Sequence, residues 1–310
     1  MNYSKEVHTF KSSNGHNLVT YFIYKPLTSP RAILQISHGM CEYVERYEHF
    51  IDFMTIQGIL VCGNDHIGHK NSVANKEDLG YFASRNGWTY LTKDLATLTR
   101  SIKKEYPNLP IFLFGHSMGS FIARAYLVEY PDLLNGAIIC GTAGTNPILG
   151  LGKFFISMVK TLKGDRYRSK FLDNLMFGSY NKKYATVRTA KDWLSTDETI
   201  VDTYLKDEYC MFIFTTSAFH DLSMLLGSVS SNEWYRFVPK NLPIYLISGS
   251  MDPVGNYSKG ILEVAERLNA QQLSDFSYKL YPNYRHELLN EIGKEEVYQD
   301  VLNFVNTHIS

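Results

Sequence analysis

The stretch Ile111-Phe-Leu-Phe-Gly115-His116-Ser117-Met118-Gly119-Ser120 decides the fold of this 310-residue chain. Its first four residues are continuously apolar, as in a strand buried on both faces of a parallel sheet. The residues that follow Ser117 have the spacing of an amphipathic helix up to Glu129. A G-x-S-x-G pattern between such a strand and such a helix predicts a sharp, strained turn, because its two glycines let the backbone bend. The alternative is a glycine-rich turn with an incidental serine, which this setting disfavours.

Further short apolar runs alternate with stretches of helical spacing along the chain. This alternation predicts right-handed crossovers and a doubly wound, mostly parallel sheet. An N-terminal pair of alternating strands, 7–11 and 18–25, is joined by an Asn14-Gly15 turn. The buried strands are expected at 32–36, 59–62, 111–114, 136–140 and 244–247, with a further alternating strand at 276–281. The helices are expected at 46–57, 88–105, 118–129, 258–268 and 295–306.

Residues 144–236 break the alternation, because they are rich in apolar and aromatic residues at helical spacing without a convincing parallel strand. Roughly ninety residues is far beyond an ordinary loop, which rarely exceeds about 15. We therefore expect a core of residues 1–143 and 237–310, with 144–236 as a helical cap. Ligands of open parallel sheets bind outside the carboxyl ends of the strands, where this cap would cover them.

The composition excludes several classes of protein. The 31 basic and 31 acidic residues balance, so no strong field attracts nucleic acid. The four cysteines are scattered, which disfavours a metal site, a redox motif or a disulfide framework. The polar N-terminus is unlike a secretory signal, and no run of about 18 apolar residues could span a membrane. We expect a cytoplasmic protein with no cofactor or metal, and its oligomeric state stays open.

Two residues that follow strands complete a constellation around Ser117. A serine hydroxyl becomes nucleophilic when a base removes its proton and an acid orients that base. In strand–turn–helix folds of this kind the chain order is serine, acid, histidine. Asp252 follows the buried strand at 244–247, and His286 follows the strand at 276–281. The alternatives are an Asx turn before proline for Asp252 and an incidental loop histidine for His286. Other candidates do not follow a sheet strand; they are His220, Asp221 and His308.

Two backbone amides are candidates for an oxyanion hole. The Met118 amide opens the helix after Ser117, where the helix dipole favours negative charge. After the first buried strand, Gly39 allows the backbone to approach the substrate closely, which makes it a candidate substrate-binding residue, and the Met40 amide follows it. The alternative for Gly39 is a simple strand-to-helix turn.

These motifs resemble the monoglyceride lipase and lysophospholipase branch of the α/β-hydrolases, also grouped as serine aminopeptidase-like hydrolases. The resemblance covers most of the chain and rests on His38-Gly39-Met40 with Glu42 and Arg46-Tyr47, on Asp65-His66-Ile67-Gly68-His69, on Gly115-His-Ser-Met-Gly119, on Ser248-Gly-Ser-Met-Asp252-Pro-Val and on His286-Glu287. It implies an α/β-hydrolase fold with a mostly parallel eight-stranded sheet, flanking helices and a helical cap over an acyl tunnel. It also implies a Ser117, Asp252, His286 triad with the Met40 and Met118 amides as oxyanion donors.

Other residues of these motifs are given structural roles by the resemblance. The loop from Asp65 to His69 is expected to be structural instead of a metal site, and His116 to pack in the turn. The chain departs from the family at Lys70, where glycine is frequent, so the resemblance does not predict the local loop conformation there.

Apolar residues of the cap predict a site for an apolar acid. We expect Ile148, Leu151, Phe155 and Met158 to receive an acyl portion, with Phe212, Phe214 and Phe219 as a second wall. The alternatives are packing within the cap or transient contact with a lipid surface.

The predicted function is hydrolysis of carboxylic esters of lipid-like substrates, such as monoacylglycerol or lysophospholipid, through an acyl-enzyme. Thioesterase, acyltransferase and aminopeptidase activities are alternatives on the same fold. An aminopeptidase needs an acidic anchor for the substrate amine; the candidates are Asp207, Glu208 and Asp221. A non-catalytic ligand-binding protein of the same fold is disfavoured because all three triad residues are present.

Overall fold

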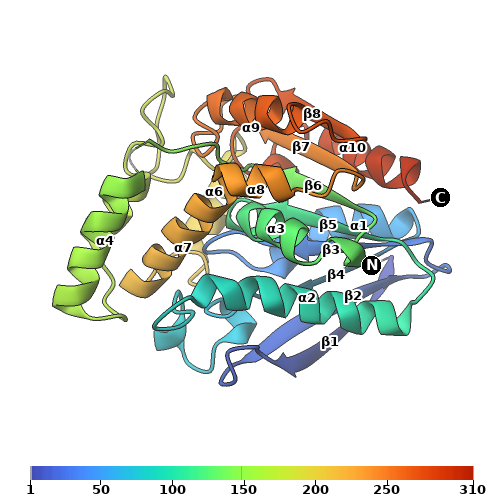
Figure 1. Ribbon diagram of the computed structural model, residues 1–310, viewed down its shortest axis with the longest axis horizontal. Coiled ribbons are helices and arrows are strands. Elements are labelled where there is room, and N and C mark those ends of the chain that lie inside the picture. Colours follow the sequence, from blue (N-terminus) through green and yellow to red (C-terminus); the bar gives the residue numbers. More distant parts are fainter. Residues whose placement is uncertain (1, 148, 310) are drawn as a thin grey trace.

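In the computed structural model, which describes residues 2–147 and 149–309, eight strands form one sheet (Figure 1). Their order is β1-β2-β4-β3-β5-β6-β7-β8. Only the pairs β1–β2 and β2–β4 are antiparallel; the pairs from β4 to β8 are parallel. The strands are β1 Tyr3–Lys11, β2 Leu18–Pro26, β3 Ala32–Ser37, β4 Ile59–Asn64, β5 Ile111–His116, β6 Gly136–Cys140, β7 Ile244–Gly249 and β8 Phe276–Tyr281. The predicted fold class is confirmed.

Helices cover both faces of this sheet. Neighbouring residues of one strand, such as Ile33 and Leu34 of β3, belong to two separate apolar cores and are both fully buried. This double burial explains why the central strands are continuously apolar in sequence. Helices α2 Gly87–Glu105, α3 Met118–Glu129 and α9 Lys259–Asn269 supply one core; α1 Glu48–Ile56 and α10 Lys294–Thr307 supply the other.

One expected helix is divided in the structure. Instead of a single helix over 46–57, a 3₁₀ turn at Val44–Tyr47 precedes α1. Short 3₁₀ turns are common at helix starts. Here the tighter turn places Arg46 and Tyr47 toward the residues described below, where Tyr47 forms a buried hydrogen bond and Arg46 a partly buried one.

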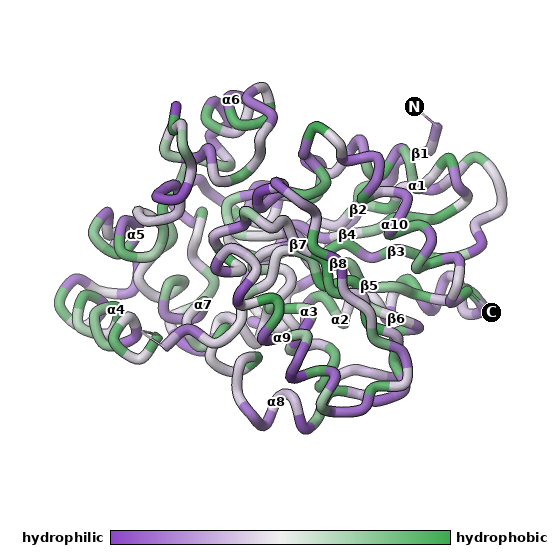
Figure 2. The backbone as a smooth tube through the Cα atoms, turned by 90° about the horizontal axis from the view of Figure 1, so that it is seen from above, coloured by the Kyte–Doolittle hydropathy of each residue, from purple (hydrophilic) through white to green (hydrophobic). Residues whose placement is uncertain are grey.

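Between β6 and β7 the structure is helical. This insertion, residues 144–236 as numbered above, holds α4 Leu149–Lys163, α5 Lys170–Phe177, α6 Glu198–Lys206, α7 Thr216–Val229 and the start of α8 Asn232–Phe237. Helix α7 packs against α2 and α3, and α4 packs against α7. Figures 1 and 2 place α4 at the end of the molecule opposite the two chain termini. In the described ranges, no helix is long and apolar enough to cross a membrane.

Candidate active site

Ser117 occupies the strained turn between β5 and α3. Its φ is 54° and its ψ is −123°, a conformation that L-residues rarely adopt. A side chain at position 119 would collide with the Ser37 carbonyl, so only glycine fits where the helix passes this strand. The Ser117 amide donates to the Cys140 carbonyl at 3.0 Å, which ties the turn to the neighbouring strand. The motif therefore presents the serine side chain at the carboxyl edge of the sheet.

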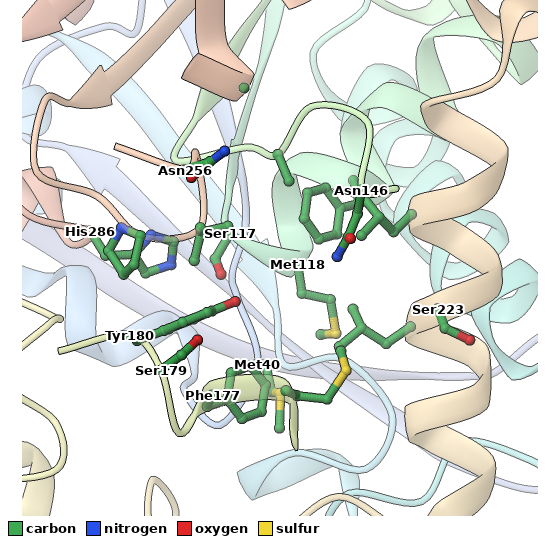
Figure 3. Close-up of a pocket in the computed structure, with 18 of the residues that line it drawn as sticks. Met40, Ser117, Met118, Asn146, Phe177, Ser179, Tyr180, Ser223, Asn256 and His286 are labelled. Atoms are coloured by element: carbon green, nitrogen blue, oxygen red, sulfur yellow. The ribbon is translucent and has the colours of Figure 1, made fainter. Parts of the chain in front are cut away.

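The structure brings Asp252 and His286 together at the same edge. His286 Nδ1 lies 3.0 Å from Asp252 Oδ2, and both side chains are buried. Asp252 also accepts from the Val254 amide at 2.8 Å, which fixes its carboxylate. His286 Nε2 is buried and has no hydrogen-bond partner among the described residues. Figure 3 shows the Ser117 side chain beside the imidazole of His286. This arrangement leaves Nε2 free for the serine hydroxyl.

The loop of Gly39 and Met40 approaches the serine closely. A Cβ atom placed on Gly39 would lie 2.9 Å from the Ser117 Cβ, so the loop needs glycine there. Met40 and Met118 both line the same cavity as Ser117. Met118 is the first residue of α3, and the first N–H groups of a helix have no intrahelical acceptor. Both candidate amides therefore belong to segments that border the serine.

Three buried histidines hold the Gly39 loop. His38 Nε2 accepts from the His66 amide at 2.9 Å, so its Nδ1 carries the proton that is donated to the Gly39 carbonyl at 2.8 Å. His69 Nε2 accepts from the Cys41 amide at 3.3 Å. Burial lowers the pKa of all three, to about 3 for His69, so these rings are neutral acceptors. Their nitrogens position backbone, and the described residues contain no group of three or more side chains suited to hold a metal ion.

Lys70 explains the departure from the family motif. Its φ is +24°, a left-handed value that glycine adopts without strain. The lysine ammonium pairs with Glu45 at 2.8 Å and lies 3.5 Å from the centre of the Tyr43 ring. These contacts offset the strain at Lys70, so the loop forms without the glycine.

A buried ionic network lies beneath the cavity. Glu42 accepts from the Gly39 amide and from Arg46 at 3.2 Å. Arg46 also forms a two-pronged salt bridge with Glu287, at 2.8 and 2.9 Å. The network thus joins the loop of Met40 to the residue directly after His286. Sequence reasoning missed this link: Glu42 and Arg46 are four residues apart, but Glu287 is 241 residues further along the chain.

His116 joins this network to the loop that carries His286. Its Nδ1 lies 2.9 Å from Glu42, and its Nε2 lies 3.2 Å from the His286 carbonyl. Burial alone would lower the pKa of His116, but the Glu42 carboxylate raises it above its ordinary value. Burial opposes ionisation of Glu42, yet His116 and Arg46 hold its pKa well below the usual range. His116 is therefore more than a packing residue of the turn, because it links both loops.

A cavity of about 490 Å³ opens onto Ser117 and His286. Leu151 and Phe155 line it as expected, and Ile148 lies outside the described residues. Its apolar walls combine residues of the core and of the insertion: Met40, Met118, Phe121, Leu149, Leu151, Phe155, Ile156, Leu175, Met176, Phe177, Trp193, Leu194, Leu222, Leu226 and Val254. The cavity is apolar enough for an acyl chain, which is the use expected from the sequence.

A comparison with known proteins identifies the family of this chain. Residues 28–293 match the model of the family described as "Serine aminopeptidase, S33". The chain belongs to this family. This S33 hydrolase is 28% identical to the monoglyceride lipase of Rattus norvegicus over 288 residues, which cover 93% of the chain and 85% of the relative. It is 24% identical to the monoacylglycerol lipase of Mycolicibacterium smegmatis, with 99% of each chain covered.

A solved structure supports the same placement. The thermostable carboxyl esterase from Bacillus coagulans, in complex with glycerol, superposes on the S33 hydrolase with a TM-score of 0.93 at 30% identity, covering 99% of each chain. Together with the curated relatives, this similarity identifies the S33 hydrolase as a carboxylic ester hydrolase.

Several residues expected to bind substrate lie elsewhere in this S33 hydrolase. Gly39 and Met158 are not among the described lining residues, and Met158 is 41% exposed on α4. Phe214 and Phe219 are fully buried, and their rings pack on each other at 6.0 Å. Phe212 packs on His69 at 5.7 Å. The described lining of the cavity does not include Phe212, Phe214 or Phe219, because these rings pack in the interior around the start of α7.

Proposed function

We propose that this hydrolase is a serine esterase that cleaves fatty acyl monoesters, of the monoacylglycerol or lysophospholipid kind, through an acyl-enzyme. The observation that carries the proposal is the unpartnered His286 Nε2 beside Ser117, at the base of a large apolar cavity. The monoglyceride lipases among its relatives support the substrate class.

The mechanism follows from this geometry. His286 removes the proton of Ser117, while Asp252 holds the Nδ1–H and stabilises the imidazolium that forms. The serine oxygen attacks the ester carbonyl, and the Met40 and Met118 amides stabilise the oxyanion, each by about 3 kcal/mol. The alcohol then leaves with the proton from His286. Water repeats the cycle on the acyl-enzyme and releases the fatty acid.

The charges around the cavity favour an ester over an aminoacyl substrate. The acidic anchors considered from the sequence do not belong to the described lining of the cavity. Each has a partner elsewhere: Asp207 accepts from Tyr43, Glu208 pairs with Lys76, and Asp221 accepts from the Gly87 amide. The carboxylates that do line the cavity are Glu42, Glu263 and Glu287. Each already has a cationic partner, so none is left to hold a free amine.

In this proposal, residues 144–236 form a cap that contacts the lipid surface. Helices α4 and α5 lie together at one end of the molecule (Figure 2). They expose large apolar side chains: Leu151, Phe154, Met158, Leu162, Phe171 and Leu175. A patch of this kind suits transient contact with a membrane surface, from which a single-chain lipid could enter the cavity.

Replacing the nucleophile tests the proposal. Ser117→Ala should abolish covalent labelling by a fluorophosphonate probe and lower kcat by at least about 10³-fold. Wild-type rates should rise from acetyl to dodecanoyl glycerol esters, because longer chains bury more apolar surface in the cavity. Persistent labelling of the variant would identify a different nucleophile, and rates that are flat with chain length would reject the acyl cavity.

A further inference from the structure

Three hydrogen-bond donors on one side of the cavity have no partner among the described residues. They are the Ser179 hydroxyl, the Tyr180 hydroxyl and the Lys191 ammonium, all from the insertion. Figure 3 shows the two hydroxyls facing the space beside Ser117. Burial raises the pKa of Tyr180, so its phenol stays protonated and can donate a hydrogen bond to an acceptor in the cavity. All three donors line the same cavity as Ser117 and His286.

Lys191 is the charged member of this group. It is partly buried, and its Nζ lies 5.9 Å from the centre of the Trp193 ring and 5.7 Å from that of Tyr204. Trp193 in turn packs on His286, with 5.1 Å between the ring centres. In the described part of the chain no carboxylate lies within ion-pair distance of this ammonium; Asp173 acts on it only through its longer-range field. The ammonium therefore lies one aromatic ring away from His286 without a counter-ion.

Nearby carboxylates are already balanced by other cations. Glu42 and Glu287 share Arg46, and His116 contacts Glu42 as a second cation when protonated. Lys259, the other lysine of the cavity wall, is exposed on α9, where water screens its charge. A partly buried ammonium is stable when an anion accepts its hydrogen bonds. Among the described lining residues, Lys191 is thus the partly buried cation without an ion-pair partner.

The reaction places the alcohol portion of the substrate near Lys191. The leaving alcohol takes its proton from His286, so it lies on the His286 side of Ser117. The acyl chain then occupies the apolar walls on the other side. We propose that Lys191, with the Ser179 and Tyr180 hydroxyls, binds a phosphate on the alcohol portion, so that this enzyme prefers anionic lysophospholipids to neutral monoacylglycerols. This inference rests on the proposed function.

The test uses two substrates that differ only by the phosphate: 1-decanoylglycerol and 1-decanoylglycerol 3-phosphate. The wild type should have the higher kcat/KM for the phosphate ester. Lys191→Met should lower that kcat/KM by at least about tenfold and change that for the neutral ester less than twofold, because a charged hydrogen bond is lost only with the anion. Lys191→Arg should retain most of the preference. Lys206→Met, on α6 outside the cavity lining, is the matched control and should leave the ratio unchanged.

Several outcomes would overturn the inference. A wild type that cleaves only the neutral ester would reject it and leave the proposed function standing, whereas cleavage of neither ester would reject both. Equal losses on both esters in Lys191→Met would show a packing role.

Protection of the wild type from fluorophosphonate labelling is an independent readout that does not need the variant to fold. Glycerol 3-phosphate should protect at concentrations at least about tenfold lower than glycerol does. Inorganic phosphate should protect poorly; if it equals glycerol 3-phosphate, the site is a simple anion site and the inference is wrong.

Discussion

Two parts of the 144–236 insertion are attached to the molecule by different forces. The segment from Asp192 to Thr196 is hydrogen-bonded to the loop of His286: the Trp193 carbonyl accepts from the His286 amide at 3.3 Å, and the Leu194 carbonyl from the Glu287 amide at 2.7 Å. The guanidinium of Arg285 adds bonds to the carbonyls of Asp192 and Ser195. These hydrogen bonds tie this part of the insertion to the loop that carries His286.

Helix α4 is attached mainly by apolar contact. Ile156 is its one fully buried residue among those described, while Phe154 and Leu162 are 62% and 73% exposed. Lys160 adds one hydrogen bond, to the Ser84 carbonyl at 2.7 Å. Hydrogen bonds are directional, whereas apolar contacts are not. The comparison teaches that directional bonds fix the segment beside His286, whereas α4 is held by contacts that do not fix its orientation as strictly.

The largest effect on stability is expected from removing Glu291, which accepts hydrogen bonds from the segment 192–196 of the insertion and from the loop of His286. This carboxylate is fully buried and accepts from the Arg285 amide at 2.7 Å and the Thr196 amide at 3.0 Å. Glu291→Ala leaves these partly buried donors unpaired, so the free energy of unfolding should fall by about 3 kcal/mol or more, with a lower kcat. Glu291→Gln should lose less. Urea unfolding and turnover of a dissolved short-chain ester measure both, and an unchanged unfolding midpoint would contradict the comparison.

A smaller, pH-dependent effect is expected at His116. Its pKa is raised in the folded protein, so its stabilising contribution is complete below its unfolded value of about 6.5 and is lost as the pH rises through the folded value. His116→Gln should therefore destabilise by about 1–2 kcal/mol near pH 6 and by less near pH 9. The Glu42 contribution, with a lowered pKa, is constant over this window. The free energies of unfolding of the wild type and of His116→Gln, measured between about pH 6 and pH 9, test this prediction. A gap between the two proteins that widens as the pH rises would reject the charged pair of His116 and Glu42.

The smallest effect on stability is expected at the exposed face of α4. Phe154→Ser combined with Leu162→Ser should change the free energy of unfolding by less than about 0.5 kcal/mol, because both side chains are largely exposed. Hydrolysis of a dissolved ester should be unchanged, but hydrolysis of monoacylglycerol dispersed in vesicles should fall several-fold. Leu27→Ser removes an equally exposed leucine far from the insertion and is the control. Equal vesicle activity in both variants would contradict lipid contact through α4.

Much of the fold was readable because its pattern is local. Ile33 and Leu34 each enter a core, so the strand is apolar at every position and visible in sequence. Strand β7, before Asp252, is buried in the same way, whereas β8, before His286, is an edge strand with an alternating pattern; both patterns are local and placed the two residues after strand ends. The role of Phe212 and Phe219 could not be read this way, because an aromatic residue at helical spacing packs equally well on a core or a cavity.

The sequence by itself determined which elements form and which residues end at the carboxyl edge of the sheet, since strand and helix periods and the G-x-S-x-G turn are properties of neighbouring residues. Only the tertiary structure decided how Arg46 joins Glu42 to Glu287. It also decided that the segment 192–196 is held by hydrogen bonds and α4 by apolar contacts, and that Lys191 lines the cavity without an ion-pair partner. Those contacts join residues far apart along the chain, and each depends on burial and distance, which no local pattern contains.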